Sequence, residues 1–339
     1  MEELVRRDEF RIVLISSYDA RFNKKAIFKS IKKLFSFYTV QIYHLATAKF
    51  IFLNDNFMPL GLLKFKKEAI ITQLWHAEGI FKKFGFDVEQ PQEIRELEKK
   101  SSEVLDYVIC SSEDVVPYYA DAFGVDESIV LPLGAARTDR LLNNKNTERL
   151  RMSFDRKYPE CKGKKLVLYA PTFRDNPEDD GNLIEKFDIK AFNERFGEKY
   201  KLLIRLHPQV HTSYTSFDGA VDVCDYQNVS ELVEVCDVLI TDYSSICMDF
   251  ALLDKPIYFY AFDLEKYNNQ RSFYVDYETY VPGPVAKDFQ TLLNLINSEI
   301  HKTYFPRNEN FKKFNFGKPD GQAAKRIVET IVYNKKYEV

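Results

Sequence analysis

The chain has 339 residues, of which 45% are hydrophobic and 29% charged, a composition typical of a folded protein with about two domains. The net charge of −3 combines +5 over residues 1–100 with −8 over the rest, and no basic run is long enough to indicate nucleic-acid binding. The five cysteines are odd in number and form no C-x-x-C pair, which argues against a disulfide framework or a zinc site and fits a reducing compartment.

The N-terminal region predicts a protein that does not cross a membrane. Its first residues lack the apolar core of a signal peptide, and no apolar stretch approaches the ~20 residues of a membrane span. Residues 25–35 have helical spacing with lysines on the polar side. This segment is either the first helix of a Rossmann-like unit or a basic amphipathic contact with a membrane. The candidates for peripheral membrane contact are Lys29, Lys32 and Lys33.

Short apolar runs alternate with helical patterns along the whole chain. Strands are predicted at residues 11–17, 39–43, 50–53, 69–74, 107–110, 128–131, 166–170, 202–206, 238–241 and 256–260. Further helices are predicted at residues 92–102, 115–123, 189–196 and 230–236. This alternation predicts an α/β fold with parallel sheets.

A polar stretch at residues 143–165 carries no strand signal and fits a surface linker and helix between two halves. We therefore expect two Rossmann-like domains, 1–155 and 156–339, facing a central crevice. The last helix is expected to pack back on the first domain. Ligands of open α/β sheets bind at the carboxyl ends of the strands, so the crevice is the expected site.

Each half has one histidine at the end of a predicted strand. His76 follows Trp75, with Glu78 and Lys82 after it, and His207 is followed by Pro208. Histidine is suited to proton transfer near neutral pH. The alternative for each is a hydrogen-bonded structural histidine.

The second half also has residues suited to binding a diphosphate. Arg174 follows a strand and a proline turn; it can bind phosphate through its planar fork, or it forms a surface pair with Asp175. Thr241, Ser244 and Ser245 lie between a buried strand and a helix that begins near Ile246.

Helix N-termini with hydroxyls attract phosphate, although the same pattern also fits an ordinary helix cap. Asp249, one turn further, is predicted to approach a ribose, and Arg271 lies on a loop that can close over a phosphate or base. A P-loop, a G-x-G-x-x-G fingerprint and metal-ligand clusters are absent from the sequence, so no cofactor and no metal are expected.

In this order, the motifs resemble the CDP-glycerol:poly(glycerophosphate) glycerophosphotransferase family, the teichoic acid primases and polymerases. The resemblance spans residues from about 10 to about 330, with these matching pieces: Trp75-His76, Lys82-Lys83, Gly85, Leu133-Gly134, Arg137-Thr138-Asp139, 170–174, His207-Pro208, 241–245, Lys255-Pro256, Arg271, Phe273-Tyr274 and Pro282-Gly283. One departure is Ala77-Glu78-Gly79, where the family often has Gly-Thr-Pro. This difference lies on the acceptor side of the expected site, so it leaves the identity of the acceptor open.

The resemblance implies a GT-B-like fold with a CDP site in the C-terminal domain and an acceptor site in the N-terminal domain. It implies attack on the β-phosphorus of CDP-glycerol, or of CDP-ribitol in some branches, with release of CMP. The acceptor would be a polyprenyl-linked or polymeric glycan at the inner face of the cell membrane.

Within this scheme His76 is expected to be the general base, and His207 to donate a hydrogen bond to phosphate. The CDP-polyol would be bound by Arg174, Thr241, Ser244, Ser245, Asp249 and Arg271. Trp75, Glu78 and Lys82 would lie on the acceptor side. Two alternatives remain open: a GT-B glycosyltransferase that uses a nucleotide sugar, and a non-catalytic nucleotide-binding subunit of an envelope-polymer assembly.

Overall fold

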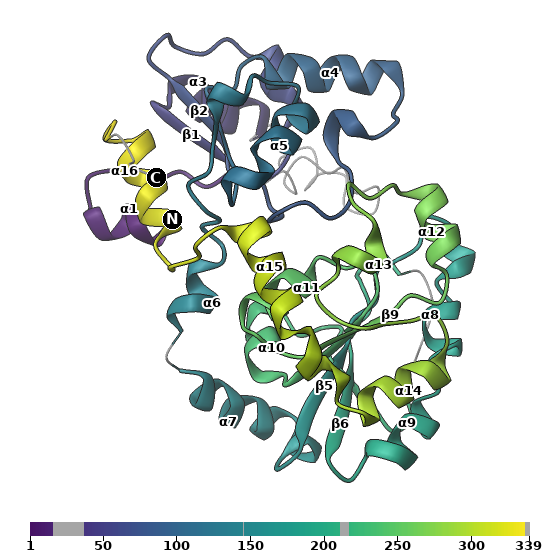
Figure 1. Cartoon of the computed structure of the whole chain (residues 1–339). Coiled ribbons are helices and arrows are strands. Elements are labelled where there is room, and N and C mark those ends of the chain that lie inside the picture. The colour runs from purple at the N-terminus through teal and green to yellow at the C-terminus, as the bar shows by residue number, and fades with distance from the viewer. Residues whose placement is uncertain (16–36, 145, 211–216, 336–339) are drawn as a thin grey trace, which may run out of the picture. The chain divides into compact units, whose positions relative to one another are not determined.

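The computed structural model describes residues 1–15, 37–144, 146–210 and 217–335 (Figure 1). Contacts divide the chain into two compact units. The first comprises Met1–Gly79, Phe84–Arg137 and Gln322–Val339, and the second Ile80–Lys83 and Thr138–Gly321. The predicted boundary at 155/156 therefore differs from the observed one, because residues 138–155 belong to the second unit.

The first unit is built on a parallel sheet with the strand order β1-β2-β3-β4. Its strands are β1 (Phe50–Leu53), β2 (Ile70–Gln73), β3 (Tyr107–Ile109) and β4 (Val130–Leu131). Neighbouring side chains of β1 enter separate cores, because they point to opposite faces of the sheet. Phe52 lies in one core with Ile327 of α16 (Ala323–Ile331), and Ile51 lies in the other with Leu45 of α3 (Ile42–Thr47).

The described part of this unit also contains the α-helices α1 (Glu2–Arg7), α4 (Gln92–Ser102) and α5 (Val116–Phe123). The N-terminal α1 lies beside the C-terminal α16 (Figure 1), where Arg7 and Glu329 form an ion pair at 3.6 Å. The last helix thus contributes to the core of the first unit, although the 184 residues from Thr138 to Gly321 of the second unit separate it in sequence from Arg137.

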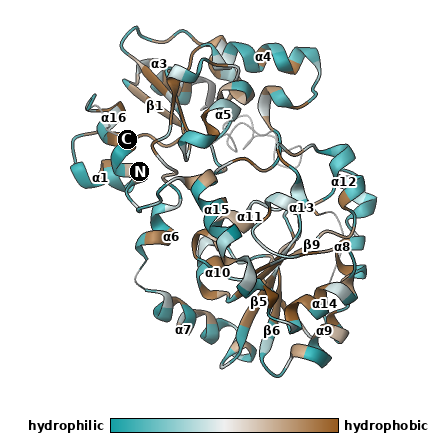
Figure 2. Ribbon diagram, in the orientation of Figure 1, coloured by the Kyte–Doolittle hydropathy of each residue, from teal (hydrophilic) through white to brown (hydrophobic). Residues whose placement is uncertain are grey.

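The second unit is built on a parallel sheet with the order β10-β9-β8-β5-β6-β7. Its strands are β5 (Lys165–Tyr169), β6 (Tyr200–Ile204), β7 (Val221–Asp222), β8 (Val238–Thr241), β9 (Ile257–Tyr260) and β10 (Val285–Ala286). Figure 2 shows β5 and β6 as mainly hydrophobic, as strands covered on both faces should be.

Helices cover both faces of this sheet. Leu168 lies in one core with Phe250 of α11, and Tyr169 lies in the other with Phe192 of α9. The helices of the unit are α6 (Asp139–Asn143), α7 (Thr147–Lys157), α8 (Asn182–Glu185), α9 (Ile189–Phe196), α10 (Val229–Val235), α11 (Ile246–Leu252), α12 (Leu264–Gln270), α13 (Tyr277–Tyr280), α14 (Phe289–Asn297) and α15 (Phe305–Phe316). The predicted α/β class with parallel sheets is confirmed.

Two predicted strands are wrong. Residues 39–43 are helical, within a π-helix at Phe37–Gln41 and the start of α3. Of the segment predicted as the strand 11–17, residues 11–15 are not in a strand, and Ile12, Val13 and Leu14 are exposed. The predicted helix at 25–35 lies outside the described residues. None of the helices that the structure describes is long and apolar enough to span a membrane.

Candidate active site

In the first unit, the backbone turns sharply where β2 ends. Trp75 has a φ of 60°, in the left-handed region that bulky residues rarely adopt. Its N–H donates to Gln73 Oε1 at 2.9 Å, and its indole stacks on Phe84 with ring centroids 5.1 Å apart. Such strain persists only where the surroundings hold it, and it concentrates at functional sites. The conformation of the loop after β2 is therefore fixed by the contacts of Trp75.

The imidazole of His76 lies at the surface beside a carboxylate. Its Nδ1 is 3.5 Å from Asp55 Oδ1, with the two side chains 52% and 73% exposed. Asp55 follows β1, the neighbour of β2 in the sheet. A carboxylate in this place orients a histidine base and stabilises the imidazolium that forms when the base takes a proton. Asp55 was not predicted, although the carboxyl ends of adjacent parallel strands meet at one edge of a sheet.

Glu78 is buried and ion-paired. Its carboxylate accepts two hydrogen bonds from Arg137, at 2.7 Å from Nε and 2.5 Å from Nη2. The Glu78 side chain is 4% exposed and that of Arg137 is 42% exposed. This bidentate geometry is the strong form of such a pair. The motif pattern alone assigns no role to Arg137, which is the solvent-exposed half of the pair.

A hollow of about 120 Å³ opens beside Trp75 within the first unit. Its aromatic walls are formed by Trp75, Phe84, Phe86 and Phe123, and polar groups come from Asn56, Gln73 and Glu98. The Glu98 carboxylate accepts from the side-chain amides of Asn56 at 2.8 Å and Gln90 at 2.6 Å. Aromatic faces with a few hydrogen-bonding groups suit a hydroxylated, uncharged ligand better than a phosphate.

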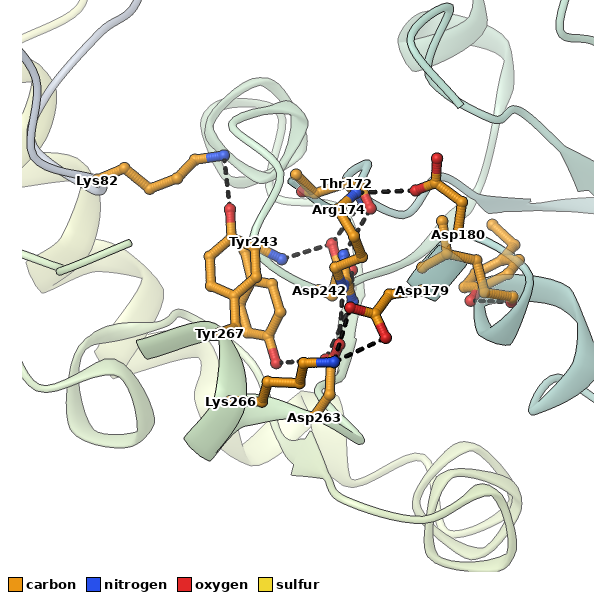
Figure 3. A network of polar contacts seen from close by, with 12 residues as sticks. Lys82, Thr172, Arg174, Asp179, Asp180, Asp242, Tyr243, Asp263, Lys266 and Tyr267 are labelled. Atoms are coloured by element: carbon orange, nitrogen blue, oxygen red, sulfur yellow. Dashed lines mark hydrogen bonds and ion pairs between the residues drawn. The ribbon is translucent and has the colours of Figure 1, made fainter. Parts of the chain in front are cut away.

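In the second unit, Arg174 lies at the centre of a buried ionic network (Figure 3). It donates to Asp242 at 2.9 Å, to Asp263 at 2.7 and 3.0 Å, and to the carbonyl of Thr172 at 2.6 Å. Burial alone would lower the pKa of Arg174, but the two carboxylates hold it above its usual value. The guanidinium predicted to bind a diphosphate thus has protein partners, and its contact with substrate stays a prediction.

The same network joins the ends of β5 and β8. Asp242 Oδ1 accepts from the N–H of Thr172 at 2.8 Å and from that of Tyr243 at 2.5 Å. Thr241 is fully buried, and its hydroxyl donates to the carbonyl of Ala170 at 2.7 Å. Thr241 and Arg174 therefore hold the two strand ends in register with each other.

The residues that follow β8 differ in their exposure. Ser245 is exposed and Ser244 half-buried, with Ser244 Oγ accepting from the N–H of Ile246 at 3.4 Å. Asp249, on α11, is 4% exposed. The two serines can therefore reach a ligand, whereas Asp249 is largely covered by protein, and its approach to a ribose stays a prediction.

His207 follows β6, and its surroundings are cationic. Its ring lies 4.8 Å from that of Phe173, and its Nδ1 accepts from the N–H of Gln209 at 3.2 Å. In the neutral ring Nε2 therefore carries the proton and can donate. Partial burial, and then the positive charges of Lys82, Arg205 and Arg271, lower the pKa of His207.

Arg271 is held by a carboxylate at the surface. Its Nε donates to Asp175 at 2.8 Å, and its guanidinium lies 5.0 Å from the centre of the Phe173 ring. The hydrogen bond with Asp175 raises the pKa of Arg271 and burial lowers it; the hydrogen bond has the larger effect, so the pKa lies above its usual value. Both partners are about 40% exposed, at 36% and 44%. An incoming anion can therefore reach this arginine, in competition with Asp175.

Lys82 lies in the second unit, although it was predicted on the acceptor side. Its Nζ donates to the hydroxyl of Tyr267 at 3.3 Å (Figure 3). Lys82, Arg271 and His207 are thus brought together in one unit. Among the residues that the structure describes, no three His, Cys, Asp or Glu side chains gather as a metal site.

Comparison with protein families shows which proteins this chain is similar to. The family model for CDP-glycerol:poly(glycerophosphate) glycerophosphotransferase matches residues 6–333. A teichoic acid poly(ribitol-phosphate) polymerase of Bacillus spizizenii is 35% identical, over 99% of this chain and 54% of its own length. A teichoic acid ribitol-phosphate primase of the same organism is 35% identical, over 86% of this chain and 76% of its own. The chain thus spans about half the length of the polymerase.

Solved structures show the same similarity in three dimensions. A variant of the wall teichoic acid polymerase TagF, soaked with CDPG, matches with a TM-score of 0.73 and 27% identity, over 85% of this chain and 73% of its own. A UDP-GlcNAc 2-epimerase from Neisseria meningitidis matches with a TM-score of 0.56 and 15% identity, over 90% of this chain and 82% of its own. The epimerase shares the fold alone.

Proposed function

The chain belongs to the CDP-glycerol:poly(glycerophosphate) glycerophosphotransferase family, and from this premise we propose that it transfers a polyol phosphate from a CDP-activated donor to a hydroxyl of a teichoic acid or similar cell-envelope acceptor. The observation that carries the proposal is the contrast between the surroundings of two histidines. His76 lies beside a carboxylate, and His207 lies among cations.

The proposed chemistry assigns one task to each histidine. The acceptor hydroxyl attacks the β-phosphorus of the donor; the bond to the bridging oxygen breaks, and its electron pair leaves with CMP. His76 takes the hydroxyl proton at Nε2, because its Nδ1 faces Asp55. His207 donates from Nε2 to a phosphate oxygen, where it stabilises the charge that develops in the transition state.

The donor-binding side of the proposal rests on the second unit. Ser244, Ser245 and Arg271 are accessible and suited to binding a diphosphate, while Arg174 and Thr241 hold the loops that carry them. The two relatives at 35% identity are named for ribitol phosphate, and those named for glycerol phosphate reach 32% or less. We therefore take CDP-ribitol as the first donor to test, with CDP-glycerol as the second.

The acceptor-binding side rests on the first unit. The hollow beside Trp75, with its aromatic walls and Gln73, suits the uncharged hydroxylated end of an acceptor. We propose that the acceptor is a polyprenyl-linked or polymeric glycan and that the protein works in the cytoplasm at the inner face of the membrane. The excess positive charge of residues 1–100, including Lys29 and Lys32, favours anionic lipid.

The test is to incubate the protein with each CDP-polyol and a lipid-linked teichoic acid primer, and to measure the released nucleotide and the extended product. Release of CMP with one polyol phosphate added per CMP supports the proposal. Release of a nucleoside diphosphate from a nucleotide sugar would support the glycosyltransferase alternative instead. Nucleotide binding without any turnover would support the non-catalytic alternative.

Membrane contact is tested separately by sedimentation with liposomes. We expect binding that needs anionic lipid and weakens as salt increases, with roughly 1 kcal/mol for each basic residue near the surface. Binding that is indifferent to salt and to anionic lipid contradicts this part of the proposal, and leaves the transfer reaction untouched.

A further inference from the structure

The segment Ile80–Lys83 comes from the N-terminal half of the sequence but is part of the second unit. Lys82 pairs with Phe273 in an antiparallel bridge, and the N–H of Lys83 donates to the carbonyl of Ser272 at 3.0 Å. Phe81 is buried, 5.5 Å from Phe273 between ring centroids. The position of Lys82 is therefore set by backbone pairing and by an aromatic anchor, independently of its own charge.

The ammonium of Lys82 has few acceptors. In the part of the chain that the structure describes, Nζ donates one side-chain hydrogen bond, to the neutral hydroxyl of Tyr267 at 3.3 Å. Lys255, in the same unit, is the useful contrast: its Nζ donates to the carbonyls of Val233, Glu234 and Cys236 at 2.7 to 2.8 Å. An ammonium has three N–H donors. Lys255 is satisfied by the fold, whereas Lys82 keeps donors for a ligand.

The titratable and charged groups that influence Lys82 come from several other segments. Asp242 and Cys247 favour its charged form, and Arg271 and Arg174 oppose it. The Asp242 carboxylate is already shared among Arg174 and the N–H groups of Thr172 and Tyr243. The Asp242 carboxylate is thus neutralised by another cation. The Asp175 carboxylate, whose pKa the charge of Lys82 helps to lower, is bound by Arg271.

Lys82, Arg271 and His207 lie close enough to affect one another electrostatically. The charges of Lys82 and Arg271 both disfavour protonation of His207, and Arg271 disfavours protonation of Lys82. Gathering like charges costs free energy, which an anionic ligand bound among them recovers. A diphosphate has the charge and the number of acceptor oxygens that this group requires.

We propose that Lys82 binds the diphosphate of the CDP-polyol donor, together with Arg271 and His207. Lys82 follows the acceptor-side residues Trp75 and Glu78 in the sequence, but this proposal assigns it to the donor site. The assignment rests on the proposed function, because it names a further ligand of the same donor. Lys82 acts as a binding residue, and no proton transfer is ascribed to it.

One property of Lys82 gives the proposal its own measurable signature. Burial, only partly opposed by the charge of Asp242, lowers the pKa of Lys82 to about 8. The ammonium binds the anion and the neutral amine does not, so donor affinity is highest below this pKa and falls as the pH rises through it. Arginine at position 82 remains charged throughout this range, and its binding should not show the fall.

The experiment is calorimetric titration of CDP and of CMP into the wild-type chain and three variants, Lys82→Met, Lys82→Arg and Lys83→Met, with CDP-ribitol titrated into the wild-type chain as well. Lys83 is the matched control, because it is the exposed neighbour on the same segment. We expect Lys82→Met to weaken CDP binding by roughly 10- to 100-fold and CMP binding by less, since CMP lacks the second phosphate. Lys83→Met should leave both affinities unchanged, and Lys82→Arg should retain most of the CDP affinity.

Each outcome has a separate meaning. Wild-type affinity for CDP that falls above a pH of about 8, with no such fall in Lys82→Arg, supports the proposal. Equal CDP affinity in Lys82→Met and Lys83→Met overturns it. A wild-type CDP affinity that does not change with pH also overturns it, and this measurement does not depend on any variant being folded. A wild-type chain that binds neither CDP nor CDP-ribitol refutes the proposed function itself.

Discussion

The two units place a histidine at the same kind of position and give it opposite surroundings. His76 and His207 each follow a strand of a parallel sheet. A carboxylate faces Nδ1 of His76 at 3.5 Å. Partial burial, and then the cations around His207, lower the pKa of His207. The comparison teaches that the environment, and not the residue type or its place after a strand, assigns base and donor roles.

The comparison also changes what we expect of His207. From the sequence, His207 is expected to donate a hydrogen bond to phosphate, as a charged imidazolium does. With its pKa lowered and its Nδ1 accepting from Gln209, His207 donates from Nε2 in the neutral form. Activity therefore need not decline when His207 loses its charge.

The largest expected effect is at the base. His76→Ala should lower the transfer rate by on the order of 10² to 10⁴, the usual contribution of a general base, with CDP binding nearly intact. His44→Ala, a substitution on α3 of the same unit, is the control and should retain activity. The measurement is CMP release with the native acceptor. Near-normal turnover of His76→Ala would contradict the assignment of His76 as the general base.

The next effect is on stability and concerns the second unit alone. Arg174→Met leaves the buried Asp242 and the partly buried Asp263 without their cation, so we expect a loss of about 3 to 5 kcal/mol in the free energy of unfolding. Arg271→Met breaks an exposed pair and should cost about 0 to 1 kcal/mol, measured in the same urea titration. Equal losses in the two variants would contradict the division between a structural arginine and a ligand-binding one.

The residues between β8 and α11 test the donor side of the comparison. The double substitution Ser244→Ala with Ser245→Ala should weaken CDP binding by about 1 to 3 kcal/mol, the range for hydrogen bonds to charged groups. Calorimetry measures this directly. Because both serines belong to the second unit, turnover at saturating donor should change less than affinity, and an unchanged affinity would reject this part of the site.

The smallest effect is expected at Asp55. The pair with His76 is exposed and 3.5 Å long, and exposed pairs contribute roughly 0.2 to 1 kcal/mol, so Asp55→Asn should lower the rate by no more than about five-fold. The rate should be measured with donor and acceptor saturating. A loss as large as that of His76→Ala would show that Asp55 does more than orient the imidazole.

Sequence patterns predicted the second unit better than the start of the first. Runs such as 238–241 and 256–260 became strands buried on both faces, because a parallel sheet turns continuous apolar residues into core. Residues 39–43 have β-branched and aromatic side chains but form helix, since strand propensity depends on the surroundings. The exposed Ile12 to Leu14 show that an apolar run alone does not make a strand.

For the site, sequence located the loops but not the partners within them. Strand ends and motifs pointed to His76, His207 and Ser244, because the chemistry of parallel sheets concentrates there. Asp55 and Asp263 lie 21 and 89 residues from the side chains that they pair with, so only the strand order brings them together. The position of Lys82 depends on the brief passage of the chain from the first unit into the second at Ile80–Lys83, which no local sequence pattern reveals.

The passage of the chain between the two units restricts how members of this family can recombine. Along the described chain, the path changes unit after Gly79, Lys83, Arg137 and Gly321. A single exchange point between β1 and α16 would therefore combine parts of the first unit from different parents and separate α16 from strands of its sheet. Where the exchange point falls between Lys82 and Tyr267, it would also separate these two residues. Functional hybrids should need the segments 80–83 and 322–339 to come from the same parent as the unit in which they pack. Donor and acceptor specificity should therefore rarely be exchanged independently by a single recombination event.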